Sequence, residues 1–303
     1  MNQALSVDTA DIVESDRDSE LPALLEDIYQ HYNHDFRQYA AASLTRRINW
    51  ALRKLKMADI AQLRDYIVQA PQNFSTLLQY ITVPVSAMFR DPAYFLALRQ
   101  HVVPVLKTYS SPKIWVAGCC TGEEAYSIAI VLREEGLLER SVIYATDINP
   151  AALEQAARGI FRNDQIRAYT ENYQRAGGKT AFSDYYHAAY DNAVLDKELR
   201  KNIIFAEHSL TTDSVFSEMQ LISCRNVLIY FKRELQSATF DLFHESLCRR
   251  GFLGLGARET LDFSPRAHQF DNCVKSLRIY QKNNESLIVN PVEGLRRFQP
   301  ARN

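Results

Sequence analysis

The sequence contains no long apolar run and only five cysteines, and these absences exclude several classes of protein. No segment approaches the roughly 20 apolar residues of a membrane-spanning helix. The N-terminus is acidic and polar, unlike the basic and then apolar start of a signal peptide. The cysteines form no CxxC pair and no Cys/His cluster with metal-ligand spacing. We therefore expect a soluble, cytoplasmic protein with reduced thiols, no membrane insertion and no metal.

The sequence also has little net charge, a formal −1 over 303 residues, but its charges are unevenly distributed. Residues 1–30 carry eight acids and one base, whereas residues 35–60 carry six bases and two acids. We expect the acidic residues 1–19 to be disordered. The basic segment is short and the whole chain is not basic, which disfavours nucleic acid and favours an acidic protein partner.

Residues 20–82 predict a small helical domain, because their apolar residues recur at helical spacing without strand alternation. The expected helices are Leu21–Tyr32, Ser43–Lys56, Ile60–Gln69 and Asn73–Tyr80. In the second helix the apolar row places Arg46 and Arg53 on the opposite side, with Lys56 beside them. These bases form either an ordinary solvated face or a docking face for an acidic partner.

Residues 83–112 predict a linker and a helix that begins at Pro92, after Asp91. From 113 to 282, apolar strands alternate with helices, which predicts an α/β fold with a doubly wound, mostly parallel sheet. Seven strands are expected, at residues 113–118, 141–146, 202–206, 219–224, 251–256, 269–274 and 276–281. Residues 160–201 are too long for one crossover and predict an inserted β subdomain, and residues 283–303 a weakly ordered tail.

The segment Lys113–Leu132 predicts a strand, a small-residue loop and a helix, typical of a nucleotide-type cofactor site. Asp147, 29 positions after Gly118, ends the next strand and can accept two ribose hydroxyls. The loop lacks the third glycine of dinucleotide enzymes, and Glu123 and Glu124 follow it directly. A pyrophosphate there would meet two carboxylates, which disfavours an NAD-linked reductase. S-adenosylmethionine, which is cationic and has a ribose but no phosphate, fits the site.

Four segments together resemble the chemotaxis receptor methyltransferases, the CheR family, which methylate glutamate side chains of bacterial chemoreceptors. They are SAMFRDPAYF (86–95), CCTGEEAYSIA (119–129), ATDIN (145–149) and CRNVLIYF (224–231). The resemblance extends from about residue 25 to residue 282. It implies a seven-stranded, Rossmann-like methyltransferase sheet with an all-α N-terminal domain and an inserted β subdomain.

The resemblance also implies a role for each matching residue. Arg90 and Tyr230 would lie near the methyl group and the incoming carboxylate as catalytic residues. Glu124 would bind the amino group of the cofactor, and Asp147 its ribose. The full set of cofactor-binding residues would be Ser86, Arg90, Gly118, Glu124, Asp147, Ser209, Leu210, Arg225 and Asn226.

The implied reaction is methylation of glutamate carboxylates on methyl-accepting chemoreceptors, with S-adenosylhomocysteine as the second product. No general base is needed, because the carboxylate is ionised at neutral pH and the leaving group is a neutral thioether. The basic side chains Arg46, Arg53 and Lys56 would hold the acidic cytoplasmic helices of the receptor.

The sequence departs from the family pattern at four positions, Pro84, Ser86, Ala257 and Arg258. Weaker activity or another acceptor therefore stays open, as does a non-catalytic adaptor that senses S-adenosylmethionine or S-adenosylhomocysteine. The intact Arg90, Asn226 and Tyr230 count against the adaptor. We expect a monomer, and the short insertion favours a form that does not dock on a receptor tail.

Overall fold

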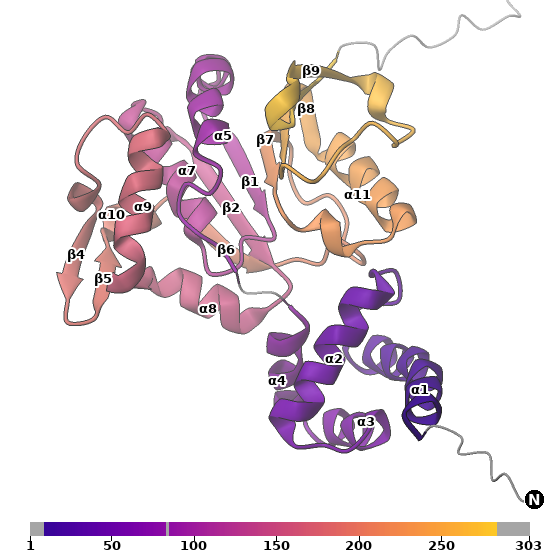
Figure 1. Ribbon diagram of the computed structural model, residues 1–303. Helices are drawn as coiled ribbons and strands as arrows, with labels where there is room; N and C mark the ends of the chain where they lie inside the picture. The colour runs from indigo at the N-terminus through magenta and orange to yellow at the C-terminus, as the bar shows by residue number, and fades with distance from the viewer. Residues whose placement is uncertain (1–8, 83–84, 284–303) are drawn as a thin grey trace, which may run out of the picture.

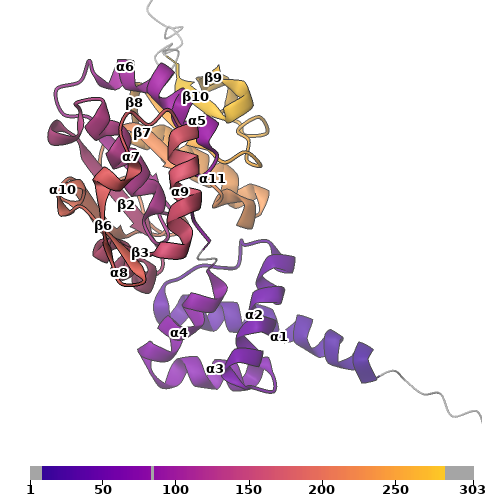
Figure 2. The same ribbon diagram turned by 60° about the vertical axis from the view of Figure 1, so that its left-hand side comes forward.

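The structure is a computed structural model that describes residues 9–82 and 85–283, a helical domain and an α/β domain (Figures 1 and 2). The helices of the first domain are α1 (Thr9–Tyr32), α2 (Ala41–Leu55), α3 (Ile60–Gln69) and α4 (Pro71–Ile81). Their apolar faces share one core around Leu24, Ile48 and Leu77, each at most 1% exposed. The predicted helical domain is confirmed.

The first helix begins earlier than we expected. It starts at Thr9, so residues 9–19, which we expected to be disordered, belong to α1. Residues 1–8, the remainder of that segment, lie outside the described residues, as do Pro84 and residues 284–303 of the expected tail.

The segment before the sheet is helical from Pro92, the start that the sequence predicted. It runs as α5 (Pro92–Ala97), a π-helical turn (Leu98–Val102) and α6 (Val103–Leu106). Asp91 precedes it with a φ of 58°, so the chain turns sharply between the linker and the helix.

The main sheet has seven strands in the order β6-β2-β1-β7-β8-β10-β9. The strands are β1 (Lys113–Ala117), β2 (Val142–Asp147), β6 (Ile203–Glu207), β7 (Met219–Cys224), β8 (Leu247–Leu255), β9 (Phe270–Val274) and β10 (Ile279–Lys282). The first five in chain order are parallel, and β10 pairs antiparallel with β8 and β9. The predicted doubly wound, mostly parallel sheet is confirmed.

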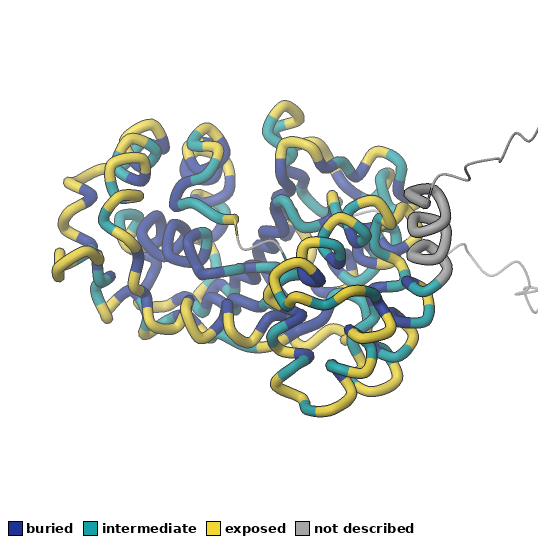
Figure 3. Tube along the Cα trace, turned by 60° about the horizontal axis from the view of Figure 1, so that its bottom comes forward, coloured by how far each residue is buried: buried dark blue, intermediate teal, exposed yellow. Residues whose placement is uncertain are grey.

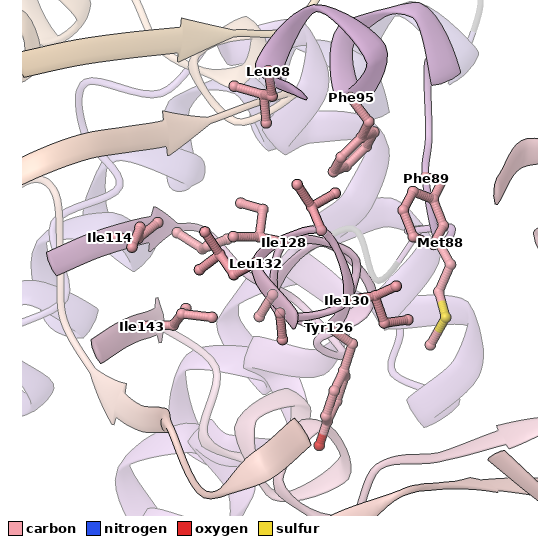
Figure 4. Close-up of a cluster of buried hydrophobic side chains, with 14 of the residues drawn as sticks. Met88, Phe89, Phe95, Leu98, Ile114, Tyr126, Ile128, Ile130, Leu132 and Ile143 are labelled. Atoms are coloured by element: carbon pink, nitrogen blue, oxygen red, sulfur yellow. The ribbon is translucent and has the colours of Figure 1, made fainter. Parts of the chain in front are cut away.

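Helices cover both faces of the sheet. Successive side chains of a strand point to opposite faces, so the apolar strands present apolar side chains on both sides. The covering helices include α7 (Glu123–Glu134), α8 (Pro150–Arg158) and α11 (Arg233–Ser246). On one face Ile114 of β1 packs with Ile128 of α7 in a large apolar core (Figure 4). On the other face Trp115, the next residue of β1, packs with Phe243 of α11.

The insertion between β2 and β6 contains a second, antiparallel sheet of three strands, as expected, together with helices that we did not expect. Its elements are β3 (Ile160–Arg162), α9 (Asn163–Arg175), β4 (Tyr186–Ala189), β5 (Asn192–Leu195) and α10 (Lys197–Arg200). Tyr169 and Tyr173, one turn apart on α9, pack into the main core. The low overall hydrophobicity of α9 concealed this short apolar row.

The two domains meet beside the end of β7. Ala40, just before α2, donates its N–H to the Tyr230 carbonyl over 2.8 Å, and Lys232 N–H donates to the Gln38 carbonyl over 2.9 Å. Figure 3, coloured by the burial of each residue, shows buried residues in both domains. The helix α2 is thus fixed directly against the segment that holds Tyr230.

A buried carboxylate joins α9 to α7 and gives a test of the fold. Glu134, whose side chain is 3% exposed, pairs with Arg99 and accepts a hydrogen bond from Tyr173. Glu134→Ala should lower the unfolding free energy by about 3 kcal/mol at pH 7, because it leaves the Arg99 charge incompletely paired. Chemical denaturation measures the change, and the exposed Glu139→Ala is the control.

The same pair predicts a pH dependence. Burial by itself would raise the pKa of Glu134. Hydrogen bonds from Tyr173 and Lys179 and the charge of Arg99 outweigh burial and hold the pKa below its usual value of 4.5. A carboxyl whose pKa is lowered on folding stabilises the protein above its unfolded pKa and loses this contribution as the pH falls. The difference between the wild-type and Glu134→Ala proteins should therefore shrink below about pH 4.5. A difference that grows in acid would contradict the assignment.

Candidate active site

A cavity lies where the carboxyl ends of the parallel strands face the helical domain. In open α/β sheets this edge is where ligands bind. Of the residues predicted for the site, the cavity is lined by Ser86, Arg90, Gly118, Glu124, Asp147, Leu210, Arg225, Asn226 and Tyr230. The structure thus brings together residues from the linker, four strand ends and the helix α7.

The loop after β1 passes very close to the loop after β7. Gly118 has a φ of +74°, and a Cβ on it would lie 2.4 Å from the Val227 Cγ2. Gly118 and Cys119 both donate their N–H groups to the Thr146 carbonyl over 2.8 Å. A glycine is therefore required at 118 for both the backbone conformation and the close approach.

Asp147 lies at the end of β2 with its carboxylate at the cavity. Its Oδ2 accepts from Cys120 N–H over 2.8 Å and its Oδ1 from Asn149 N–H over 3.0 Å. A carboxylate has about four acceptor positions, so each oxygen can still accept from a ligand hydroxyl. Burial raises the pKa of Asp147 above its usual value, and the hydrogen bonds from these backbone N–H groups offset only part of the rise. Asn149 caps α8, and its side-chain oxygen accepts from Ala151 N–H over 3.1 Å.

The start of α7 carries two carboxylates, as the sequence indicated. Glu123 is buried and accepts from the Thr121 hydroxyl over 2.7 Å. Burial raises the pKa of Glu123, and hydroxyls around it, those of Thr121, Ser86 and Tyr169, lower it. Glu124 lines the cavity instead. A ligand phosphate is disfavoured here, whereas an ammonium group would find an acceptor in Glu124.

Arg225 is the buried hub of the site, with a side chain 1% exposed. Its Nη1 donates to Glu124 Oε2 over 3.0 Å, and its Nη2 donates to Asp91 Oδ2 and to the Arg90 carbonyl over 2.8 Å each. The guanidinium carbon also lies 4.1 Å from the centroid of the Tyr94 ring. Ser223 donates to the other oxygen of Glu124 over 2.6 Å. Arg225 therefore positions Glu124 and the loop that carries Arg90.

The Arg90 side chain remains available to a ligand. Within residues 9–82 and 85–283, its guanidinium makes one hydrogen bond, to the Val85 carbonyl at 3.3 Å. The segment is anchored by Phe89 N–H, which donates to the Ser127 hydroxyl over 2.9 Å. A fixed backbone with free guanidinium donors suits a bidentate contact with a carboxylate.

Glu259 shapes the loop that carries Asn226 and Tyr230, and its role was not predicted. Its carboxylate accepts backbone N–H bonds of 2.6–2.9 Å from Asn226, Val227, Leu228 and Gly256. Burial raises the pKa of Glu259, and these N–H groups lower it. Only the fold shows that the Glu259 carboxylate holds this loop, because the two segments lie about 30 residues apart in the sequence.

The basic residues predicted for substrate binding do not line the cavity. Arg46 and Arg53 are exposed on α2 and Lys56 is exposed just after it, whereas Arg47, which was not predicted, lines the cavity. The Arg47 Nη1 lies 3.4 Å from the Thr82 carbonyl, and burial lowers the pKa of Arg47. The helical spacing correctly predicted which side of α2 faces away from the core of the helical domain. It could not predict which side of α2 the α/β domain approaches.

Ser209 is also absent from the cavity lining, although Leu210 is present. The Ser209 N–H donates to Asp213 Oδ2 over 2.8 Å, and its hydroxyl lies 2.7 Å from that of Thr211. The neighbouring His208, which was not predicted for the site, lines the cavity instead.

Comparison with known proteins defines the class. Residues 84–276 match the family described as "CheR methyltransferase, SAM binding domain", and residues 19–82 match "CheR methyltransferase, all-alpha domain". The fold and the site are those of a methyltransferase that uses S-adenosylmethionine. The chain belongs to the CheR methyltransferase family.

Relatives of this family align with most of the chain. A Pseudomonas putida protein, named provisionally as the methyltransferase Cher3, is 55% identical over 89% of this chain and 99% of its own length. The chemotaxis protein methyltransferase of Listeria innocua is 32% identical over 75% of this chain and 84% of its own length. That of Vibrio parahaemolyticus is 30% identical over 75% and 82%.

Neither a metal-binding cluster nor a membrane-spanning helix is present among residues 9–82 and 85–283. No group of three or more His, Cys, Asp or Glu side chains there could hold a metal ion. No helix there has both the length and the hydropathy to cross a membrane.

The Asp147 carboxylate at the end of β2 gives a test of the cofactor site. Asp147→Asn should weaken S-adenosylhomocysteine binding by about 1.5 to 3 kcal/mol, because hydrogen bonds between ligand hydroxyls and a charged acceptor are lost. Isothermal titration calorimetry measures the dissociation constants. The exposed Asp164→Asn is the matched control. Unchanged affinity in the Asp147→Asn protein would remove Asp147 from the cofactor site.

Proposed function

We propose that the protein transfers the methyl group of S-adenosylmethionine to glutamate side chains of methyl-accepting chemoreceptors. The observation that carries the proposal is the convergence of Arg47, Arg90 and Tyr230 on the cavity that Glu124 and Asp147 also line. Two cations and a phenol suit an incoming carboxylate, and two carboxylates suit the ammonium and ribose groups of the cofactor. The names of the Listeria and Vibrio relatives support a chemotaxis role.

The residues present fit the cofactor. When bound, S-adenosylmethionine supplies a methyl group on a positively charged sulfur. Glu124, held by Ser223 and Arg225, would accept from its α-amino group. Asp147 retains acceptor positions for the two ribose hydroxyls. Leu210 provides an apolar surface beyond Asp147 for the purine.

The proposed reaction is a direct displacement. A carboxylate oxygen of the receptor glutamate forms a bond to the methyl carbon as the carbon–sulfur bond breaks, and that electron pair stays on sulfur. The products are a methyl ester and a neutral thioether, and no proton moves. Arg90 and Tyr230 would orient the carboxylate for in-line attack, and orientation can supply roughly 7 to 11 kcal/mol of barrier reduction.

The acceptor would reach the cavity along α2. This helix carries Arg47 at the cavity and Arg46 and Arg53 on its exposed surface. An acidic receptor helix lying across α2 could therefore present one glutamate to Arg47 and Arg90 while its other acids face the exposed bases. On this basis we propose a cytoplasmic enzyme that acts on the cytoplasmic helices of chemoreceptors.

Transfer of labelled methyl groups to purified chemoreceptor signalling domains tests the function. Wild-type protein should give a label that mild alkali releases as methanol, because glutamyl methyl esters are hydrolysed by base. Arg90→Ala should lower kcat/KM by about 10- to 100-fold, because charge-assisted hydrogen bonds to the carboxylate are lost. The exposed Arg167→Ala is the control.

Two results would contradict the proposal. An alkali-stable label would indicate an acceptor other than a carboxylate. Cofactor binding without any transfer to receptor domains would favour the sensing adaptor.

Charge reversal tests the docking face. The double variant Arg46→Glu and Arg53→Glu should lower kcat/KM for the receptor several-fold at low salt. The difference should narrow at 0.5 M salt, because exposed charges are screened there. Reversal of Arg249 and Lys275, which are exposed on the other domain, is the control. An equal rate in wild type and the α2 variant at low salt would rule out the docking face.

A further inference from the structure

Trp50 on α2 is a large aromatic side chain that the fold leaves 40% exposed. The sequence has two tryptophans, and the other, Trp115, is completely buried. The Trp50 ring packs edge-to-face against Tyr80 of α4, with the ring centroids 5.0 Å apart. This aromatic pair, Trp50 and Tyr80, has no part in the function described so far.

The aromatic pair lies next to the cavity, on the side of the helical domain. Residues three or four positions apart share one side of a helix, so Trp50 and Lys54 continue the row of α2 that begins with Arg47 at the cavity. On α4, Tyr80 directly precedes Ile81, which also lines the cavity. The two helices pack together on the side of their domain that faces the α/β domain (Figures 1 and 2). A segment that leaves the cavity along α2 would therefore pass over the aromatic pair.

Bases surround the aromatic pair. The Lys54 Nζ lies 5.8 Å from the centroid of the Trp50 ring, and Arg46 and Arg53 are exposed on the neighbouring row of α2. Among residues 9–82 and 85–283, these three bases have no ion-pair partner. Tryptophan and tyrosine often dominate the energy of protein interfaces, and complementary charge sets the partner. The surface thus suits a segment that combines acids with an apolar side chain.

The separation of Arg47 and Trp50 sets the spacing that the partner needs. Three helical residues span about 4.5 Å along the axis. A helix lying along α2 has the same rise, so a glutamate at Arg47 would place a side chain three or four positions away over Trp50. We propose that the aromatic pair is an apolar subsite for the acceptor helix. It would select chemoreceptor segments with an apolar residue three or four positions from the methylated glutamate. This inference rests on the proposed function.

Methyl transfer to purified chemoreceptor signalling domains tests the subsite. Trp50→Ala should lower kcat/KM about tenfold, mainly through KM, because an aromatic contact with the acceptor is lost. Trp50→Phe should keep most of the activity. The loss in Trp50→Ala should persist at 0.5 M salt, unlike that of the Arg46 and Arg53 reversal, because salt does not screen an apolar contact. Val68→Ala, which is exposed on α3, is the control.

Trp50 also gives a readout that does not depend on the reaction. Because Trp115 is buried, a change in solvent exposure on receptor binding should appear in the emission of Trp50. Addition of the receptor domain should shift the emission of wild type to shorter wavelength, and Trp50→Phe should show no shift.

A change on the receptor completes the test, at the glutamate that the label identifies. Replacing the apolar residue three or four positions away by serine should lower kcat/KM in wild type but not in Trp50→Ala, whose folding circular dichroism verifies. Equal kcat/KM in wild type and Trp50→Ala would overturn the inference and leave methyl transfer intact. So would an unchanged emission, or an unchanged rate in wild type with the altered receptor. Absence of transfer by wild type would instead contradict the proposed function, and the inference with it.

Discussion

The site depends on one buried cation. Arg225 joins the end of β7 to Glu124 at the start of α7 and to Asp91 beside Arg90, with distances of 2.8–3.0 Å. A buried guanidinium is tolerated only when opposite charges and acceptors surround it, so these segments are held together by the cost of leaving it unpaired. The arrangement fixes Glu124, which we propose to bind the cofactor, and the Arg90 loop, which we propose to bind the acceptor, at the same time.

A second buried charge organises the opposite wall in the same way. Glu259 gathers the backbone N–H groups of residues 226–228 and thereby shapes the turn that leads to Tyr230. The Tyr230 carbonyl in turn accepts from Ala40, just before α2. The helix that we propose to receive the substrate and the loop that carries Tyr230 are therefore directly connected.

Much of this could be predicted from the sequence. The alternation of apolar strands with helices predicted the mostly parallel sheet. Gly118, Glu123 and Asp147 favoured S-adenosylmethionine over a dinucleotide as the cofactor.

Two features depend on tertiary contacts and could not be predicted in this way. The approach of the α/β domain brings Arg47 rather than Arg46 of α2 to the cavity, and the Glu259 carboxylate accepts from a backbone N–H 30 residues earlier in the chain. Helical spacing and motif matching report neighbours along the chain, whereas these partners are far apart in the sequence. The hydrogen bonds of Ser209 to Thr211 and Asp213 are local, but motif matching says nothing of them.

The most direct test of this account is a crystal structure of the protein with S-adenosylhomocysteine. The account predicts that the ligand amino group lies within hydrogen-bond distance of Glu124 and the ribose hydroxyls within that of Asp147, while Arg225 keeps its bonds to Glu124 and Asp91. A ligand bound elsewhere, or an Arg225 that leaves Glu124 to bind the ligand carboxylate, would contradict it.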